Sequence, residues 1–283
     1  MAADKITRKA KVTMKVAASE RLAEGVYSLK LQKPEGEFLN AVRPGQFVGV
    51  YPKDGAMLLP RPISICDYDT DEGWLRLVYR VAGKGTNEFS GLHPGDSADV
   101  LGILGNGYDT AELSGKRILL LGGGIGAPPM LGLARALHAA NRARGTEHPE
   151  ELVTAVMGYR SNDLFLTEEF RAVSHLIIAT DDGSAGFHGN VVEAVRSGLQ
   201  EAGGCPYDAV CACGPLPMLK GVKALAQELQ IPCWISLEER MACGVGACLG
   251  CVVKTTKEDG HSHVNNARIC TEGPVFAAEE VEI

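Results

Sequence analysis

The chain has 283 residues, of which 45% are hydrophobic and 22% charged, and its formal net charge is −7. This composition is ordinary for a soluble globular protein, and the length suggests two domains or more. The negative charge argues against nucleic acid as the main partner, because phosphate groups select basic surfaces. The charged N-terminus lacks the apolar core of a signal peptide, and no stretch approaches 18 uninterrupted apolar residues, so we expect a cytoplasmic protein without a membrane partner.

Residues 8–105 contain short β-type runs separated by turn residues. Alternation of polar and apolar side chains at this regular spacing predicts an antiparallel barrel or sandwich. The runs are AKVTMKVA, GVYSLKLQ, GQFVGVYP, PISICDYD, GWLRLVYRVA and DSADVLGIL.

Two short motifs in this region are candidates for holding a dinucleotide. Arg61 and Ser64 stand in R-x-x-S spacing, where a guanidinium can hold a pyrophosphate and a hydroxyl can hydrogen-bond a flavin ring. Further along, Gly83, Gly85 and Thr86 form a potential phosphate-cradling turn. Taken singly, each motif is more often an ordinary turn at a barrel edge.

Near Lys116 the pattern changes to an apolar strand, a glycine turn and a helix, in KRILLLGGGIGAPPMLGLARALHAANRA. Three more strand-plus-helix units follow. Strands that alternate with helices of this length predict a parallel, doubly wound sheet. The units begin at ELVTAVMGYR, HLIIATDDG and YDAVCACGP.

The first glycine turn of this region resembles a phosphate-binding turn. Gly122, Gly124 and Ala127 stand in G-x-G-x-x-A register between a strand and a helix, where a phosphate can approach the backbone. The turn Cys213-Gly214 follows another strand and should line the same crevice, within reach of a nicotinamide. The alternative is a tight turn without a ligand.

The choice between NAD and NADP stays open at this stage. Where an acidic residue would hold the ribose 2′-hydroxyl, the sequence has GYRSND. Arg160 favours a 2′-phosphate, whereas Asp163 favours the opposite.

The C-terminal region contains a cysteine cluster. Cys243, Cys248 and Cys251 stand in C-x4-C-x2-C spacing, and Cys270 follows in NARICTEGPVF. This is the plant-type spacing for a [2Fe–2S] cluster that four thiolates hold. In a reducing compartment, clustered cysteines are more often metal ligands or catalytic groups than disulfides.

The glycines between these cysteines should let the loop curl round a compact anionic core. Gly244, Gly246 and Gly250 are expected to adopt positive φ. A structural zinc site is the competing interpretation, but it usually shows two similar C-x2-C knuckles. The other cysteines outside the turn at Cys213 are expected to be small core residues: Cys66, Cys205, Cys211 and Cys233.

The three sites make chemical sense together. A nicotinamide moves two electrons as a hydride, whereas an iron–sulfur cluster moves one electron at a time. A flavin converts between the two modes, so a chain that binds both other groups is expected to bind a flavin as well.

The motifs RPIS, GGGIG, CGP and the C-x4-C-x2-C…C tail resemble those of the ferredoxin reductase superfamily. More narrowly, SLEERMACGVGACLGCVVKT and CTEGPVF resemble the electron transfer subunit of type B dihydroorotate dehydrogenase, over essentially the whole chain. This resemblance implies a multi-domain β plus α/β fold: an antiparallel flavin-binding β-barrel, a doubly wound parallel α/β nucleotide domain and a small C-terminal [2Fe–2S] domain. The expected boundaries are 1–110 for FAD, 111–231 for NAD and 232–283 for the cluster.

The same resemblance implies a function and a partner. Electrons would pass from an FMN-containing dihydroorotate dehydrogenase catalytic subunit through the cluster and FAD to NAD+, in pyrimidine synthesis. Two copies of each subunit would form a heterotetramer. We predict no catalytic residue in this chain, because we find no acid/base pair and the substrate's base would belong to the partner.

The resemblance also implies the site residues. The expected cluster ligands are Cys243, Cys248, Cys251 and Cys270. The expected FAD contacts are Arg61, Pro62, Ile63, Ser64, Val78, Tyr79, Arg80, Gly85 and Thr86. The expected NAD site contains Gly122, Gly123, Gly124, Gly126, Cys213 and Gly214.

Two other functions compete with this one. The first is a flavin/iron–sulfur subunit of another NAD(P)H-linked oxidoreductase, such as a ferredoxin-dependent transhydrogenase or a sulfite reductase. The second is a zinc-stabilised regulatory or scaffold protein, which predicts neither a flavin spectrum nor NADH oxidation with a dye.

Overall fold

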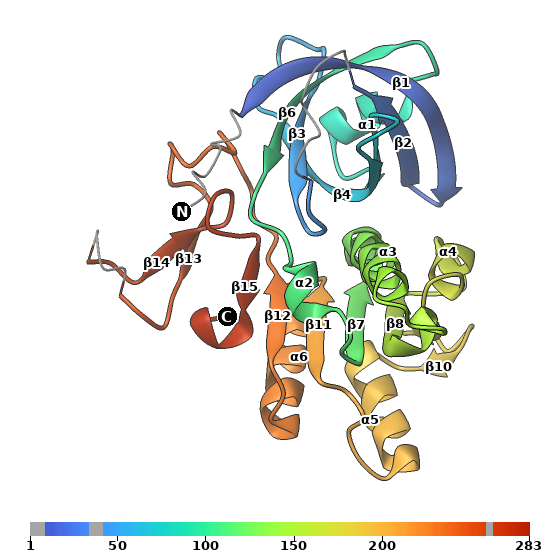
Figure 1. The fold of residues 1–283 in the computed structure, drawn as a ribbon. Coiled ribbons are helices and arrows are strands. Elements are labelled where there is room, and N and C mark those ends of the chain that lie inside the picture. Colours follow the sequence, from blue (N-terminus) through green and yellow to red (C-terminus); the bar gives the residue numbers. More distant parts are fainter. Residues whose placement is uncertain (1–8, 34–41, 259–262) are drawn as a thin grey trace.

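The computed structural model describes residues 9–33, 42–258 and 263–283. Figure 1 shows three parts: a β-barrel, an open sheet with helices below it, and the C-terminal segment beside both. The predicted fold class, a β region followed by an α/β region and a cysteine-rich tail, is confirmed. None of the helices in the described ranges has the length and apolar character needed to cross a membrane.

Six antiparallel strands close into a barrel in the order β1-β2-β5-β4-β3-β6. In β6, Ala98, Val100, Gly102 and Leu104 are buried, while the residues between them are less buried. This period of two fills the barrel with alternate side chains. A short helix, α1, follows β5. The bounds are β1 Ala10–Ala23, β2 Val26–Gln32, β3 Phe47–Tyr51, β4 Arg61–Asp69, β5 Trp74–Arg80, α1 Lys84–Ser90 and β6 Ser97–Leu104.

The α/β part is a seven-stranded sheet in the order β10-β9-β8-β7-β11-β12-β15. All neighbouring strands are parallel except β12 and β15. The strand order reverses between β7 and β11, and doubly wound sheets bind ligands at this point. The bounds are β7 Ile118–Gly123, β8 Val153–Tyr159, β9 His175–Thr180, β10 Phe187–His188, β11 Ala209–Cys213, β12 Cys233–Ser236 and β15 Val275–Ala277.

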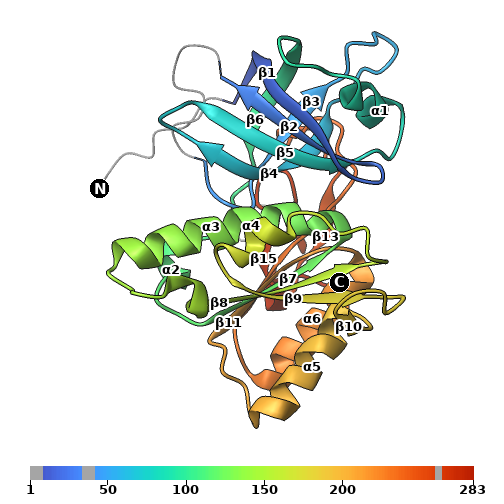
Figure 2. The same cartoon turned by 90° about the vertical axis from the view of Figure 1, so that its right-hand side faces the viewer.

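Helices cover both faces of the sheet. Figure 2 shows α3 and α4 between the sheet and the barrel, and α5 and α6 on the opposite face. The α helices are α2 Thr110–Leu113, α3 Ala127–Ala143, α4 Thr167–Arg171, α5 Val191–Ala202 and α6 Leu216–Leu229, and the 3-10 turns are Gly124–Gly126, Pro149–Leu152 and Ala278–Glu280.

Helix α3 joins the barrel to the sheet. A Cβ atom on Gly132 would lie 2.8 Å from a carbonyl oxygen of β4, so only glycine allows this approach. Beside this contact, Arg135 of α3 pairs with Asp67 of β4 and with Glu169 of α4. Nη1 of Arg76 on β5 lies 2.6 Å from the same Glu169 carboxylate. The charged network therefore ties both parts together at one place.

The C-terminal segment is connected to the α/β part through the sheet. Its strands β12 and β15 extend the α/β sheet, so the sheet continues beyond residue 231. Strands β13 (Val252–Lys254) and β14 (Asn266–Arg268) form a small antiparallel ribbon at the side. This ribbon carries the cysteine loop before it and the last cysteine after it.

Candidate cofactor sites

The four predicted cluster ligands stand around the β13–β14 ribbon. Cys243 and Cys248 lie on the loop that precedes the ribbon, whereas Cys251 and Cys270 directly flank it. Cys251 and Cys270 are buried, and Cys248 is exposed. The ribbon hydrogen bond from Ile269 N–H to the Cys251 carbonyl, at 2.9 Å, keeps the two buried cysteines next to each other.

The thiols lie near one another in two pairs. Cys248 affects the pKa of Cys243, and Cys251, followed by Cys243, affects the pKa of Cys270. Burial and the neighbouring Cys251 thiol raise the pKa of Cys270 to about 11. A two-iron cluster with four protein thiolates needs two ligands on each iron, and these two pairs fit that requirement.

Backbone N–H groups point at two of the sulfurs and favour the charged form of Cys243. Val245 N–H lies 3.5 Å from the Cys243 sulfur, and Gly250 N–H lies 3.4 Å from the Cys248 sulfur. Burial raises the pKa of Cys243, but hydrogen bonds from Val245, Cys248 and Ala247 outweigh it and lower the pKa to about 6. Because the thiolate is the metal-binding form, the lowered pKa of Cys243 favours metal binding by this loop.

The expected positive φ of the three loop glycines is found at two of them. Gly244 and Gly246 have φ of 68° and 84°, as predicted, but Gly250 does not have positive φ. Leu249 takes the left-handed conformation instead, with φ of 57°. The role of Gly250 is different, because its N–H group donates to the Cys248 sulfur.

The donor set fits a [2Fe–2S] cluster better than a single zinc ion. Structural zinc needs four ligands round one centre. A zinc site built from cysteines usually shows two similar C-x2-C knuckles, whereas only Cys248 and Cys251 have that spacing here. Four thiols in two pairs, with N–H groups aimed at the sulfurs, are instead what a binuclear cluster requires.

The two predicted flavin motifs come together although 24 residues separate Arg61 from Gly85. Arg61 begins β4, and its guanidinium lies over Gly85, where an added Cβ would be 2.6 Å from Arg61 Nε. The Thr86 hydroxyl accepts hydrogen bonds from Ala82 and Gly83 N–H groups at 2.9 Å and 3.2 Å, so it stabilises the turn itself.

The predicted flavin residues of β5 point in different directions. Val78 and Tyr79 are buried, and the Tyr79 ring packs between Tyr27 and Phe89 inside the barrel. The side chain of Tyr79 therefore belongs to the core of the barrel. Arg80 is exposed and reaches the first glycine turn, where an added Cβ on Gly124 would be 3.8 Å from its Nη2.

The two predicted nucleotide turns lie side by side. A Cβ atom on Gly126 would come within 2.1 Å of the Cys213 carbonyl oxygen, and one on Gly214 within 3.2 Å of Gly123 N. Close packing between the two turns is therefore a sufficient reason for a glycine at position 126, with or without a bound ligand. Gly124 differs, because it has φ of 54° and a Cβ there would meet only Arg80 within 4 Å.

Relatives identify the family. Residues 238–282 match the model for the iron–sulfur cluster binding domain of dihydroorotate dehydrogenase B. The chain is 40% identical over 272 residues to the electron transfer subunit of dihydroorotate dehydrogenase B (NAD(+)) from Listeria monocytogenes serotype 4a, covering 95% of this chain and 98% of that protein. Identity to the Bacillus caldolyticus subunit of the same name is 41% over 273 residues, with 95% and 97% covered. The chain belongs to this family of electron transfer subunits.

Solved structures agree with the fold of such a subunit. A chain from the structure of an NADH-dependent reduced ferredoxin–NADP oxidoreductase, described for flavin-based electron bifurcation, matches with a TM-score of 0.78 and 30% identity, covering 95% of this chain and 89% of that one. A ferredoxin NADP+ reductase from Neisseria gonorrhoeae with bound FAD and NADP matches with a TM-score of 0.63 at 15% identity, covering 81% and 94%. The second likeness concerns the fold alone.

Sequence reasoning about this electron transfer subunit missed Ser236, which ends β12, and Glu238, which follows it, beside the Cys213 turn. Burial raises the pKa of the Cys213 thiol; the Glu238 carboxylate raises it further, whereas Ser236 lowers it. Loss of water round its carboxyl group raises the pKa of Glu238. The sequence contained a signal for these two residues. IPCWIS has the pattern of a further parallel strand, and the carboxyl ends of parallel strands meet at one crevice.

Replacement of Gly126 by alanine should damage the nucleotide turns. The added methyl group would overlap the Cys213 carbonyl, so we expect a loss of about 3 kcal/mol in the free energy of unfolding. Gly198→Ala is the matched control, because a Cβ there, inside α5, meets nothing within 4 Å. Helix propensity predicts that this control is neutral or up to about 1 kcal/mol more stable. Urea unfolding of both variants checks the pair, and equal stabilities would contradict the packing described.

Proposed function

We propose that the chain relays electrons between an FMN-containing dihydroorotate dehydrogenase catalytic subunit and NAD+, through a [2Fe–2S] cluster and FAD. The observation that supports the proposal is that the cysteine loop and the first glycine turn each approach the end of a barrel strand. An added Cβ on Gly244 of the cysteine loop would lie 3.1 Å from Leu104 at the end of β6, and Arg80 approaches Gly124. Electron transfer slows steeply with distance, so a relay needs this closeness.

Each cofactor is assigned to residues of this chain. The cluster is assigned to Cys243, Cys248, Cys251 and Cys270. FAD is assigned to Arg61, Pro62, Ile63, Ser64, Val78, Tyr79, Arg80, Gly85 and Thr86. NAD is assigned to Gly122, Gly123, Gly124, Gly126, Cys213 and Gly214. The regions 1–110, 111–231 and 232–283 then mark which cofactor each binds, whereas β12 and β15 make the last two one structural unit.

The chain's own groups bind and orient the cofactors. FAD, when bound, exchanges a hydride with the nicotinamide and single electrons with the cluster. Arg61 supplies a positive charge for the pyrophosphate, and its position over Gly85 places that charge at the turn. The Val245 and Gly250 N–H groups stabilise thiolate sulfur. The proton of the substrate is handled by the partner.

Acidic groups support NAD rather than NADP. The loop after β9 carries Asp181 and Asp182, and Asp182 N–H donates to the Arg160 carbonyl at 3.3 Å. Hydrogen bonds from the Ser184 hydroxyl and N–H lower the pKa of Asp182, which keeps it charged. Asp163 follows Arg160 by three residues in the chain. Its carboxylate accepts a hydrogen bond from Glu24 N–H at 2.8 Å. Negative charges here would repel a 2′-phosphate, despite Arg160.

The cysteine loop offers a surface for the catalytic subunit. Val245, Leu249 and Val264 are 39%, 63% and 42% exposed, although they are apolar. Exposed apolar groups round a one-electron site suit a docking partner. We place the complex in the cytoplasm, as a heterotetramer with two copies of each subunit.

Reconstitution tests the function. The chain, loaded with FAD and cluster, is mixed with the FMN-containing catalytic subunit, dihydroorotate and NAD+. We expect NADH to form only when both subunits are present. Failure of the complete mixture to produce NADH, with both subunits fully loaded, would refute the proposal.

A transhydrogenase-type subunit is the alternative with a specific observation in its favour, namely the 30% identity to the ferredoxin–NADP oxidoreductase chain. Identity to the dihydroorotate dehydrogenase B subunits is higher, at 40% over nearly their full length. NADPH-linked reduction of ferredoxin, without activity on dihydroorotate, would favour the alternative.

A further inference from the structure

The turn between β6 and α2 touches both the barrel and the segment that carries Cys270. Gly105 has φ of 78°, and a Cβ on it would lie 2.5 Å from Pro274 Cδ. On its other side, the Gly105 carbonyl accepts a hydrogen bond from Gln46 Nε2 at 2.8 Å. The barrel and the cysteine segment therefore meet at Gly105 with no side chain between them.

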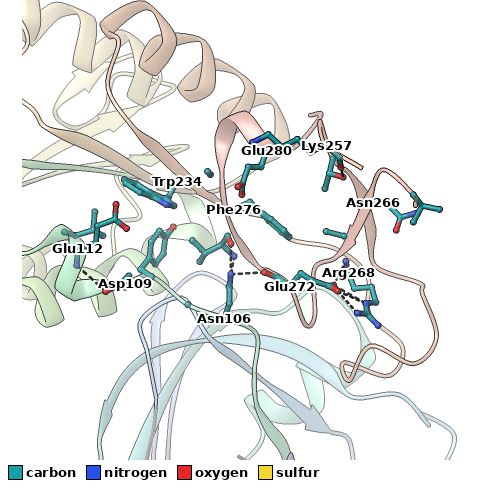
Figure 3. A pocket seen from close by; sticks show the side chains of 18 of the residues that line it. Asn106, Asp109, Glu112, Trp234, Lys257, Asn266, Arg268, Glu272, Phe276 and Glu280 are labelled. Atoms are coloured by element: carbon teal, nitrogen blue, oxygen red, sulfur yellow. Dashed lines mark hydrogen bonds and ion pairs between the residues drawn. The ribbon is translucent and has the colours of Figure 1, made fainter. Parts of the chain in front are cut away.

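Asn106 is the next residue, and both the nitrogen and the oxygen of its side-chain amide hydrogen-bond the segment that carries Cys270. Its Nδ2 donates to the carbonyl oxygens of Glu272 and Val275, at 2.9 Å and 2.7 Å. Its Oδ1 accepts from Val275 N–H at 3.1 Å, and its own N–H donates to the Gly273 carbonyl at 2.8 Å. Figure 3 shows Asn106 and its side-chain hydrogen bonds at the edge of a cleft of about 1040 Å³, near the pair of Arg268 and Glu272.

The other side of this turn leads to the proposed flavin site. Ser64 is the register partner of Phe47, and Phe47 is the partner of Leu104, the residue before Gly105. The proposed flavin strand is thus two strand pairings away from the turn. Cys270 lies two residues before Glu272, the first contact of Asn106. Asn106 links the two electron-carrying sites through a short stretch of chain.

We infer that Asn106 is a positioning residue that sets the separation between FAD and the cluster, an inference that rests on the proposed function. The segment 272–275 belongs to the cysteine-bearing tail, whereas Asn106 stands two residues after the end of barrel strand β6. Without the amide group, three of the four hydrogen bonds between them are lost, and two carbonyl groups lose a donor. The cluster would then no longer be held at one fixed distance from the flavin strand.

Stopped-flow absorbance of the loaded full-length chain tests this role in the Asn106→Ala variant. NADH is mixed in without oxygen, and flavin and cluster bleaching are followed separately. We expect flavin bleaching at the wild-type rate, because the nucleotide turns are unchanged. Cluster bleaching should be several-fold slower, because electron transfer between the flavin and the cluster slows steeply as their separation grows. Wild-type rates for both steps would overturn the inference.

Asn141→Ala is the matched control, since Asn141 is buried and its Oδ1 accepts from Gly115 N–H at 2.7 Å, far along α3 from the cysteines. It should lower the melting temperature but keep the wild-type cluster rate; an equal slowdown in this control would mean that Asn106 acts only through stability. If Asn106→Ala loads no cluster, Asn106→Ser is measured, and a wild-type rate there refutes the role. Failure of the wild-type chain to take up FAD or cluster would instead refute the proposed function.

Discussion

The Cys248→Ser variant is expected to lose the visible absorption of the cluster. Cys248 is the exposed member of its pair, and Gly250 N–H donates to its sulfur. A serine hydroxyl is far less acidic than a thiol and is a harder ligand, so one iron would lose a thiolate. Visible spectra and iron assay of anaerobically purified protein measure the effect. FAD content should stay unchanged, because the flavin residues lie on other strands.

Cys205→Ser is the control for this change. Cys205 is also exposed, but it lies outside the cysteine loop and its thiol donates to the Tyr207 carbonyl at 3.7 Å. This variant should keep the full wild-type content of iron and sulfide. A Cys248→Ser protein that retains the wild-type spectrum would show that the cluster ligands are elsewhere.

The Arg61→Ala variant should bind FAD about a hundredfold more weakly, which corresponds to about 3 kcal/mol for the loss of a charge-assisted contact to phosphate. Arg61 is already oriented in the free chain, because its Nη1 donates to the Leu59 carbonyl at 2.6 Å and its side chain covers Gly85. Titration of the flavin-free chain with FAD, followed by protein fluorescence, measures the affinity.

Arg21→Ala controls for the loss of an arginine from the barrel. Arg21 also donates to a backbone carbonyl, that of Ala23, at 3.2 Å, but it lies on β1, away from β4. Its removal should leave FAD affinity unchanged. Equal affinity of the Arg61 and Arg21 variants would contradict the assignment of the pyrophosphate to β4.

Local patterns predicted most of this fold because they report burial directly. The alternation in DSADVLGIL predicts a strand with one buried face, and β6 has it. The apolar run before Gly122 predicts a strand buried on both faces, and β7 has that burial. The spacing of the cysteines predicts a common site because the first three lie only a few residues apart.

Long-range pairing explains what the sequence did not reveal. Strand β15 joins β12 across about 40 residues, and three residues such as Val275–Ala277 carry too little periodicity to predict this partner. Nothing in the local sequence distinguishes Asn106 from other polar residues, because its partners Glu272 and Val275 lie more than 160 residues away in the chain. The positive φ at Leu249 rather than Gly250 was hidden for a similar reason, since glycine permits that conformation but does not require it.

The most direct test of the relay is an EPR spectrum of the purified chain, loaded with FAD and cluster, before and after anaerobic addition of NADH. We predict that NADH produces the signal of a reduced [2Fe–2S] cluster, and that removal of FAD abolishes this response until FAD is restored. A chain that binds zinc without iron, or a cluster that NADH does not reduce while FAD is bound, would contradict the account.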